Sequence, residues 1–249
     1  MSESERVRSA VRLLFAAILS ACCGALSAAG TDADDDWPDW AREEQDLMEQ
    51  IAAVNEGDLH FLPAERAVGE HNHLNRIRIT RDSLDGGWVT LEQCHENIDA
   101  VPAAQILFRA GGIRDLTIAS SRNIGRAWVE GHSVQLENVG AEAVLCIQAE
   151  SQALSDLGDG HYRLRNGPYM RRFLDGYYPM RVTLDIEYPA ELIEVVGQSP
   201  ASQPGFSVRN GGSDLSVDAT FEGRLITCFD FCRRGDNACA SPAPACEEG

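Results

Sequence analysis

Short runs of alternating apolar residues, separated by turn residues, constrain the fold of this chain more than any other feature. The runs cover 73–80, 88–95, 104–109, 113–119, 125–130, 132–138, 142–149, 161–165, 180–187, 192–196 and 215–227. The turn residues between them include Asp85-Gly86-Gly87, Gly111-Gly112, Gly131 and Gly140. Many short strands at this spacing are typical of an all-β fold. We therefore predict an antiparallel β-sandwich, either Ig-like or jelly-roll-like.

The first two runs can be aligned residue by residue across the turn at Asp85-Gly86-Gly87. Pairing Thr80 with Trp88 places apolar side chains on one face of the hairpin and polar side chains on the other. The apolar pairs are Ile77 with Leu91 and Ile79 with Val89, and the polar pairs are Arg76 with Glu92 and Arg78 with Thr90. This separation predicts the register of the hairpin.

The same register brings histidines together at the open end of the hairpin. His73 falls opposite His95, and a slip of two residues puts His71 there instead. Three imidazoles on adjacent strands suit zinc or copper, so His71, His73 and His95 are candidate metal ligands. The alternative is that these histidines are hydrogen-bonded at the end of the sandwich and that Cys94, beside His95, forms a disulfide.

A segment rich in tyrosine and arginine spans residues 161–188 and holds all five tyrosines of the chain. Tyrosine rings stack on sugars, and arginine binds carboxylates or phosphates through two hydrogen bonds. The candidate binding residues are Tyr162, Arg163, Arg165, Tyr169, Arg171, Arg172, Tyr177 and Tyr178. The expected partner is an envelope protein or an anionic glycan such as peptidoglycan. The alternative is that the tyrosines fill the core and the arginines pair with acidic side chains.

Four cysteines lie close together at the C-terminus: Cys228, Cys232, Cys239 and Cys246. A zinc site needs paired C-x2-C motifs or histidine partners, and this tail contains neither. We therefore predict that all four cysteines form disulfides, with a connectivity that the spacing leaves open.

The N-terminus has the features of an export signal. Arg6, Arg8 and Arg12 precede the apolar run 13–21, which is too short to span a bilayer. The run ends in Leu19-Ser20-Ala21-Cys22, which resembles the lipobox of bacterial lipoproteins. The resemblance implies lipidation of Cys22 and an outer-membrane lipoprotein facing the periplasm. Ordinary cleavage after Ser27-Ala28-Ala29 is the alternative and would give a soluble periplasmic or secreted protein.

These features divide the chain into four parts. They are a signal peptide (1–29), an acidic tether with one short helix (30–58, with the helix at 39–55), the β-sandwich (59–227) and the disulfide-rich tail (228–249).

The composition of the chain excludes several classes of function. The net charge of −18 repels phosphate backbones, so we expect no nucleic-acid partner. All 21 basic residues are arginine, which excludes Schiff-base, P-loop and Ser-Lys chemistry. Common hydrolase and nucleotide-binding motifs are missing. We therefore expect a non-enzymatic binding or scaffolding module without a cofactor. The alternatives are a periplasmic copper- or zinc-binding protein and, third, a secreted hydrolase.

Overall fold

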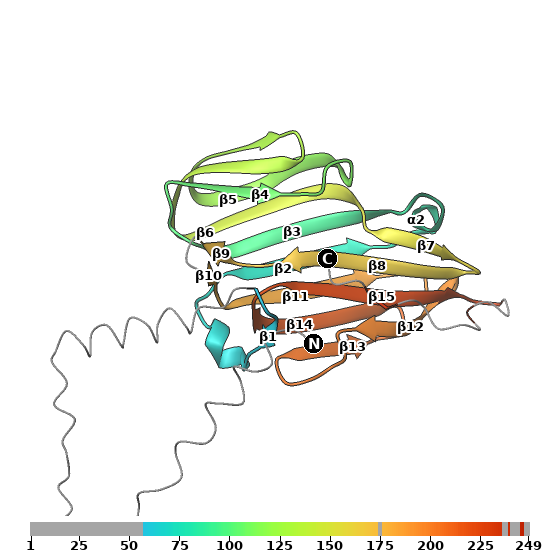
Figure 1. The fold of residues 1–249 in the computed structure, drawn as a ribbon. Helices are drawn as coiled ribbons and strands as arrows, with labels where there is room; N and C mark the ends of the chain where they lie inside the picture. Colours follow the sequence, from blue (N-terminus) through green and yellow to red (C-terminus); the bar gives the residue numbers. More distant parts are fainter. Residues whose placement is uncertain (1–56, 174–175, 236–238, 240–244, 247–249) are drawn as a thin grey trace, which may run out of the picture. The chain divides into compact units, whose positions relative to one another are not determined.

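The structure, a computed structural model, describes residues 57–173, 176–235, 239 and 245–246. Within these ranges the chain is mostly β-strand, with a short α-helix, α2 (Arg81–Gly86), and a 3-10 turn, η2 (Ala64–Ala67) (Figure 1). None of the helices in these ranges is long and apolar enough to cross a membrane. The expected signal peptide, Cys22 and the expected helix at 39–55 lie outside the described residues.

The larger sheet runs in the order β1-β14-β11-β2-β3-β6-β4, with β13 also paired to β14 and β5 to β6. Its strands are β1 (His60–Phe61), β2 (Asn72–Arg78), β3 (Trp88–Ile98), β4 (Ala103–Leu107), β5 (Ile113–Glu130), β6 (Ser133–Gln152), β11 (Met180–Glu187), β13 (Phe206–Asn210) and β14 (Asp214–Glu222). Strands β2 and β11 are parallel, whereas the other pairs are antiparallel. The sheet is therefore mixed, and the purely antiparallel arrangement that we predicted is wrong at this pair. The chain passes through the second sheet before it returns beside β2, and a parallel pair needs such a long connection.

A second, four-stranded antiparallel sheet has the order β12-β15-β8-β7. Its strands are β7 (Leu154–Gly158), β8 (His161–Tyr169), β12 (Ile193–Ser199) and β15 (Leu225–Arg233), and the short pair β9 (Arg172–Phe173) and β10 (Gly176–Tyr177) follows β8. Ile77 and Val182 of the larger sheet belong to the same hydrophobic core as Leu164 and Phe229 of the smaller one. The two sheets therefore bury their apolar faces against one core.

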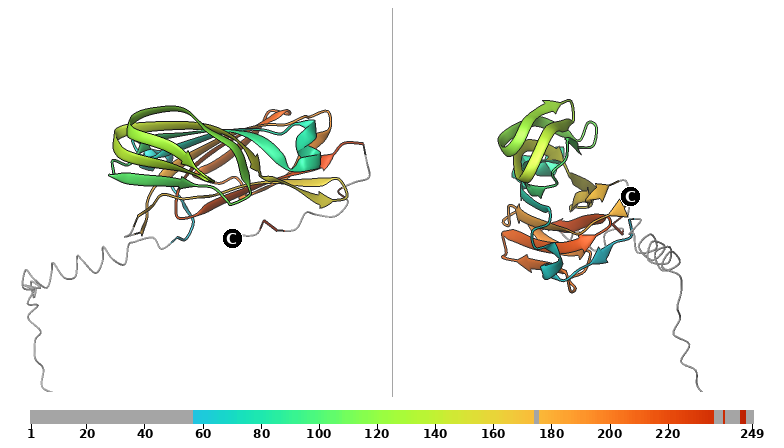
Figure 2. Two further views of the ribbon diagram at one scale, coloured as in Figure 1. Left: turned by 90° about the horizontal axis from the view of Figure 1, so that it is seen from above. Right: turned by 90° about the vertical axis from the view of Figure 1, so that its left-hand side faces the viewer.

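A second core lies inside the hairpin of β5 and β6, which folds over at one end of the larger sheet (Figure 2). Leu136 pairs with β4 on one side and with β5 on the other, and Leu145 farther along β6 pairs with β3 and β5. Three register shifts in β5 interrupt the ladder. Such bulges bend a strand, which explains why four predicted runs are two long, bent strands.

Several predicted boundaries are confirmed and others are corrected. Ile77 pairs with Leu91 as the hairpin register predicts. The connection is helix α2 instead of a simple turn, because Thr80 and Ser83 form a capping box. The run at 215–227 is two strands, β14 and β15, with Gly223 between them. Strand β15 also continues past residue 227, so the predicted tail begins inside the sheet.

Candidate functional site

The inward face of the β2–β3 hairpin changes from apolar to polar toward one end. The pair Ile77–Leu91 is followed by Asn75 opposite Gln93 and then by His73 opposite His95. All four polar side chains are buried. Buried polar groups are costly unless they are hydrogen-bonded, so their partners decide what this end of the core does.

The histidines contact one another directly. Nε2 of His71 lies 3.0 Å from Nδ1 of His95, and the ring centroids of His73 and His95 are 4.2 Å apart. Nε2 of His73 contacts the side-chain amide of Gln93. The structure therefore brings together the three histidines that the register predicts, and we call His71, His73, His95 and Gln93 the histidine cluster.

Strand β8 covers the histidine cluster with a tyrosine. The ring of Tyr169 lies edge-on to His73, with centroids 5.0 Å apart. Its hydroxyl accepts a hydrogen bond of 2.7 Å from the side-chain amide of Asn75. Burial raises the pKa of Tyr169, so its hydroxyl stays protonated near neutral pH.

Burial also keeps the imidazoles uncharged. Desolvation lowers the pKa of His71 from 6.5 to about 4 and that of His73 to about 3. The pKa of His95 is lowered well below 6.5 for the same reason. Neutral imidazoles each keep one lone pair, which is the form that binds metal ions.

Three buried atoms in this region have no hydrogen-bond partner among the described residues. They are Nε2 of His95, Oε1 of Gln93 and Oδ1 of Asn75. An unpaired buried polar atom costs about 1–3 kcal/mol. All three can accept, so a bound cation or a hydrogen-bond donor would supply the missing interaction.

An ion-pair network lies beside the histidine cluster. Nε of Arg171 donates to Asp99 over 2.9 Å, and the same guanidinium binds Glu70 and the carbonyl oxygen of Pro179. The charges of Asp99 and Arg171 act in opposite directions on the pKa of His71. The network therefore adds fixed charges of both signs next to the cluster.

The structure divides the eight residues predicted to form a binding surface. Tyr162 and Tyr169 are buried in the core. Arg163 donates two hydrogen bonds to Asp230, and Arg171 is held by the network above. These four side chains are buried or paired within the fold, so the eight do not form one open surface.

The other four residues lie nearer to solvent. Arg165 is half-buried on β8, whereas Arg172 is exposed and lies 5.6 Å from the ring centroid of Tyr177. The ring of Tyr178 packs edge-on against Phe173. A role in binding glycan or an envelope protein stays a prediction for Arg165, Arg172, Tyr177 and Tyr178.

The four cysteines predicted to be oxidised form disulfides, Cys228–Cys246 and Cys232–Cys239. A third disulfide joins Cys94 to Cys146 across β3 and β6, beside His95.

The sequence analysis missed His161 as a neighbour of the tail cysteines. Strand β8 places His161 opposite Cys232, within 4.8 Å of the sulfurs of Cys232 and Cys239. Among the described residues, His161, Cys232 and Cys239 form the group of three whose potential metal-ligand atoms all lie within 4.8 Å of one another. The three histidines of the histidine cluster do not meet this distance criterion. The two sulfurs are bonded to each other. No local signal links His161 to a cysteine 71 positions later, because strand pairing alone brings them together.

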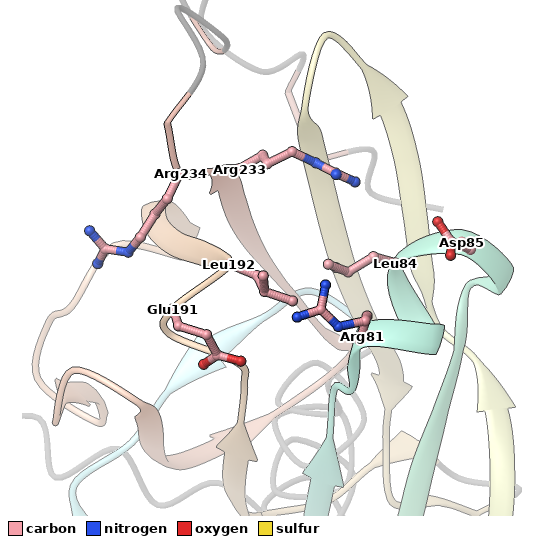
Figure 3. A pocket seen from close by; sticks show the side chains of 7 residues that line it. All are labelled: Arg81, Leu84, Asp85, Glu191, Leu192, Arg233 and Arg234. Atoms are coloured by element: carbon pink, nitrogen blue, oxygen red, sulfur yellow. The ribbon is translucent and has the colours of Figure 1, made fainter.

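The described residues also form an open cavity of about 250 Å³. It lies where α2, the turn before β12 and the end of β15 meet (Figure 3). Its lining residues are Arg81, Leu84, Asp85, Glu191, Leu192, Arg233 and Arg234. No sequence motif indicates this site, because its charged residues come from three separate segments.

Comparisons with known proteins identify no family. No family model matches the chain, and no curated protein matches it. One solved structure with some similarity is an M1 zinc metallopeptidase from Deinococcus radiodurans, at a TM-score of 0.36 and 11% identity over 72% of this chain and 43% of that one. Another is a two-domain M1 zinc metallopeptidase, at 0.34 and 12% over 72% and 44%. The chain spans less than half the length of either structure, and similarity at this level carries no argument about function.

Proposed function

We propose that this chain is an exported, non-enzymatic binding protein whose histidine cluster takes up a copper or zinc ion. The observation that carries the proposal is the 3.0 Å approach of Nε2 of His71 to Nδ1 of His95, with the neutral imidazole of His73 next to the ring of His95. Nitrogen and amide-oxygen donors in one buried place are a ligand set that zinc and Cu²⁺ accept.

The contacts in the cluster support this ligand set. Nε2 of His71 and Nδ1 of His95 are 3.0 Å apart. Two nitrogens bound to a tetrahedral zinc ion, each at about 2.0–2.1 Å, are separated by about 3.4 Å. His71 and His95 therefore need only a small shift to share an ion. His73 has to turn away from Gln93 to become the third ligand.

The test is metal titration of the purified full-length protein, with Zn²⁺ and Cu²⁺ added separately after dialysis against a chelator. We expect one ion per chain, and we expect His71→Gln and His95→Gln to weaken binding at least tenfold. His132→Gln is the matched control, since His132 lies in the turn between β5 and β6. Equal affinity in all four proteins would overturn the proposal.

A second readout keeps the test informative if a variant folds poorly. A ligand that binds only the folded state at 100 times its Kd adds about 2.7 kcal/mol to the free energy of unfolding. Wild-type protein and His132→Gln should therefore gain stability on addition of metal. Lack of any gain in the wild type would show that the cluster is a hydrogen-bonded part of the core.

Three disulfides indicate an oxidising compartment, as found outside the cytoplasm.

We propose further that the β-sandwich is anchored in the outer membrane through lipidated Cys22. The support for this anchor is the sequence Leu19-Ser20-Ala21-Cys22 after the arginine cluster. Intact-mass analysis of the native protein should show a lipid adduct on Cys22. A mature N-terminus at Gly30 would instead mean a soluble exported protein.

A further inference from the structure

The open cavity described above is lined by charges of both signs. Arg81, Arg233 and Arg234 bring positive charge, and Asp85 and Glu191 bring negative charge. Its volume of about 250 Å³ equals roughly eight waters at about 30 Å³ each. The cavity is therefore large enough for a small solute but too small for a typical drug-sized ligand.

Two of the arginines are fixed by the fold. Arg233 donates to the hydroxyl of Tyr162 and lies 5.7 Å from its ring centroid. Nε of Arg234 donates to the carbonyl oxygen of Ala190 over 2.7 Å, and its Nη1 pairs with Glu194 at 2.9 Å. These contacts hold two cationic groups at the end of β15, and Figure 3 shows Arg233 extending over the cavity.

Arg81 and Glu191 face each other across the cavity (Figure 3). Arg81 is the first residue of α2, and Glu191 lies in the turn before β12. Both side chains are exposed. Neither forms an ion pair within 4.0 Å with any of the described residues. The side chains of Leu84 and Leu192 contribute apolar surface to the same cavity. A cation and an anion therefore face the same cavity from opposite sides, with space for a solute between them.

We propose that this cavity binds a small zwitterion, an α-amino acid or a short peptide. Arg81 would receive the carboxylate through charge-assisted hydrogen bonds, and Glu191 would receive the ammonium group, while Arg233 adds positive charge to the lining of the same cavity. A simple anion would meet the repulsion of Glu191 and Asp85, and a simple cation would meet that of the three arginines. A solute that carries both a positive and a negative charge can pair with the arginines and with the carboxylates of the cavity at the same time.

The test measures binding of L-alanine, D-alanine and Ala-Ala by calorimetry or ligand-observed NMR, with acetate and methylammonium as single-charge probes. We expect saturable binding of at least one zwitterion, and at least tenfold weaker binding of acetate and of methylammonium. Chelator is present throughout, so failure of the metal proposal does not affect the result.

Variants assign the binding to this cavity. Arg81→Gln and Glu191→Gln should each weaken zwitterion binding at least tenfold. Arg76→Gln is the matched control, because Arg76 is an exposed arginine paired with Glu92 on β3. Acetate binding as tightly as alanine would show a plain anion site and overturn the proposal. Lack of saturable binding by every zwitterion, or equal binding in all variants, would overturn it as well.

Discussion

His73 of β2 lies directly opposite His95 of β3, with the two ring centroids 4.2 Å apart. The apolar pair Ile77–Leu91 fixes this relationship, since each step of two residues along an antiparallel pair keeps side chains on the same face. The histidines therefore face the core, and their burial is a consequence of the register. This burial also makes the folded state sensitive to pH.

We predict that the free energy of unfolding falls as the pH drops below about 6.5. The pKa of His71 is about 4 and that of His73 about 3 in the folded protein, against 6.5 in the unfolded chain. The unfolded state therefore binds protons between these values while the folded state does not. The loss should reach about 1.4 kcal/mol per pH unit for each histidine that stays neutral. Urea unfolding between pH 8 and pH 5 measures it.

His73→Asn removes one of these groups and should flatten the pH dependence of stability. His132→Asn, in the β5–β6 turn, is the control and should keep the slope of the wild type. An unchanged slope in His73→Asn would mean that this imidazole titrates alike in the folded and unfolded states, which would contradict its lowered pKa.

The sequence predicts local pairing well because strand alternation is a local signal. It gives the register of β2 and β3 and therefore the meeting of His73 with His95. It does not predict that β11 pairs with β2 in parallel, because no feature of either strand specifies a neighbour more than a hundred residues away. Strands β7 and β13 were missed, since both are mostly exposed and carry little apolar alternation.

The clustering of arginines and tyrosines in one segment predicts function less well than the alternation of apolar residues predicts strand pairing. The arginines at 161–188 suggested a surface, but the partner of Arg163 is Asp230, 67 residues later. The composition of a segment cannot show whether a charge faces solvent or a distant carboxylate. The sequence also did not predict that the amide oxygens of Gln93 and Asn75 are buried without a hydrogen-bond partner. Burial of these amides depends on the strands of the opposite sheet, which the local sequence does not specify.

Gly223 should tolerate no side chain. Its φ is +90°, and an added Cβ would clash with the backbone carbonyl of Asp58. Gly212 has a similar φ of +94° with open space around it. We expect Gly212→Ala to cost about 1–3 kcal/mol from backbone strain alone. Gly223→Ala should cost clearly more, and equal melting temperatures for the two variants would contradict the close approach of Asp58.

The three disulfides should contribute unequally to stability. The paired cysteines are 52 residues apart in Cys94–Cys146, 18 in Cys228–Cys246 and 7 in Cys232–Cys239. Loop-closure entropy in the unfolded state predicts contributions of about 4, 3 and 2 kcal/mol in that order. Replacing each pair by alanine and measuring denaturant unfolding tests the order. Alkylation of denatured, unreduced protein should label none of these six cysteines.

Two adjacent arginines provide the sharpest test of the segment at 161–188. Arg171, with 14% of its side chain exposed, pairs with Asp99 and Glu70, whereas Arg172 is exposed. Arg171→Ala would leave two partly buried carboxylates without their cation, and breaking a buried ion pair costs about 3–5 kcal/mol. We expect a loss near the lower end of that range, because Glu70 retains contact with water.

Arg172→Ala should change the free energy of unfolding by less than about 1 kcal/mol, since it removes only an exposed contact with Tyr177. Denaturant unfolding of both variants separates the two roles. If Arg171→Ala is as stable as Arg172→Ala, then the ion pairs of Arg171 do not hold the fold. Arg171 would then again be available for a partner, and the binding role first predicted for this segment would be favoured.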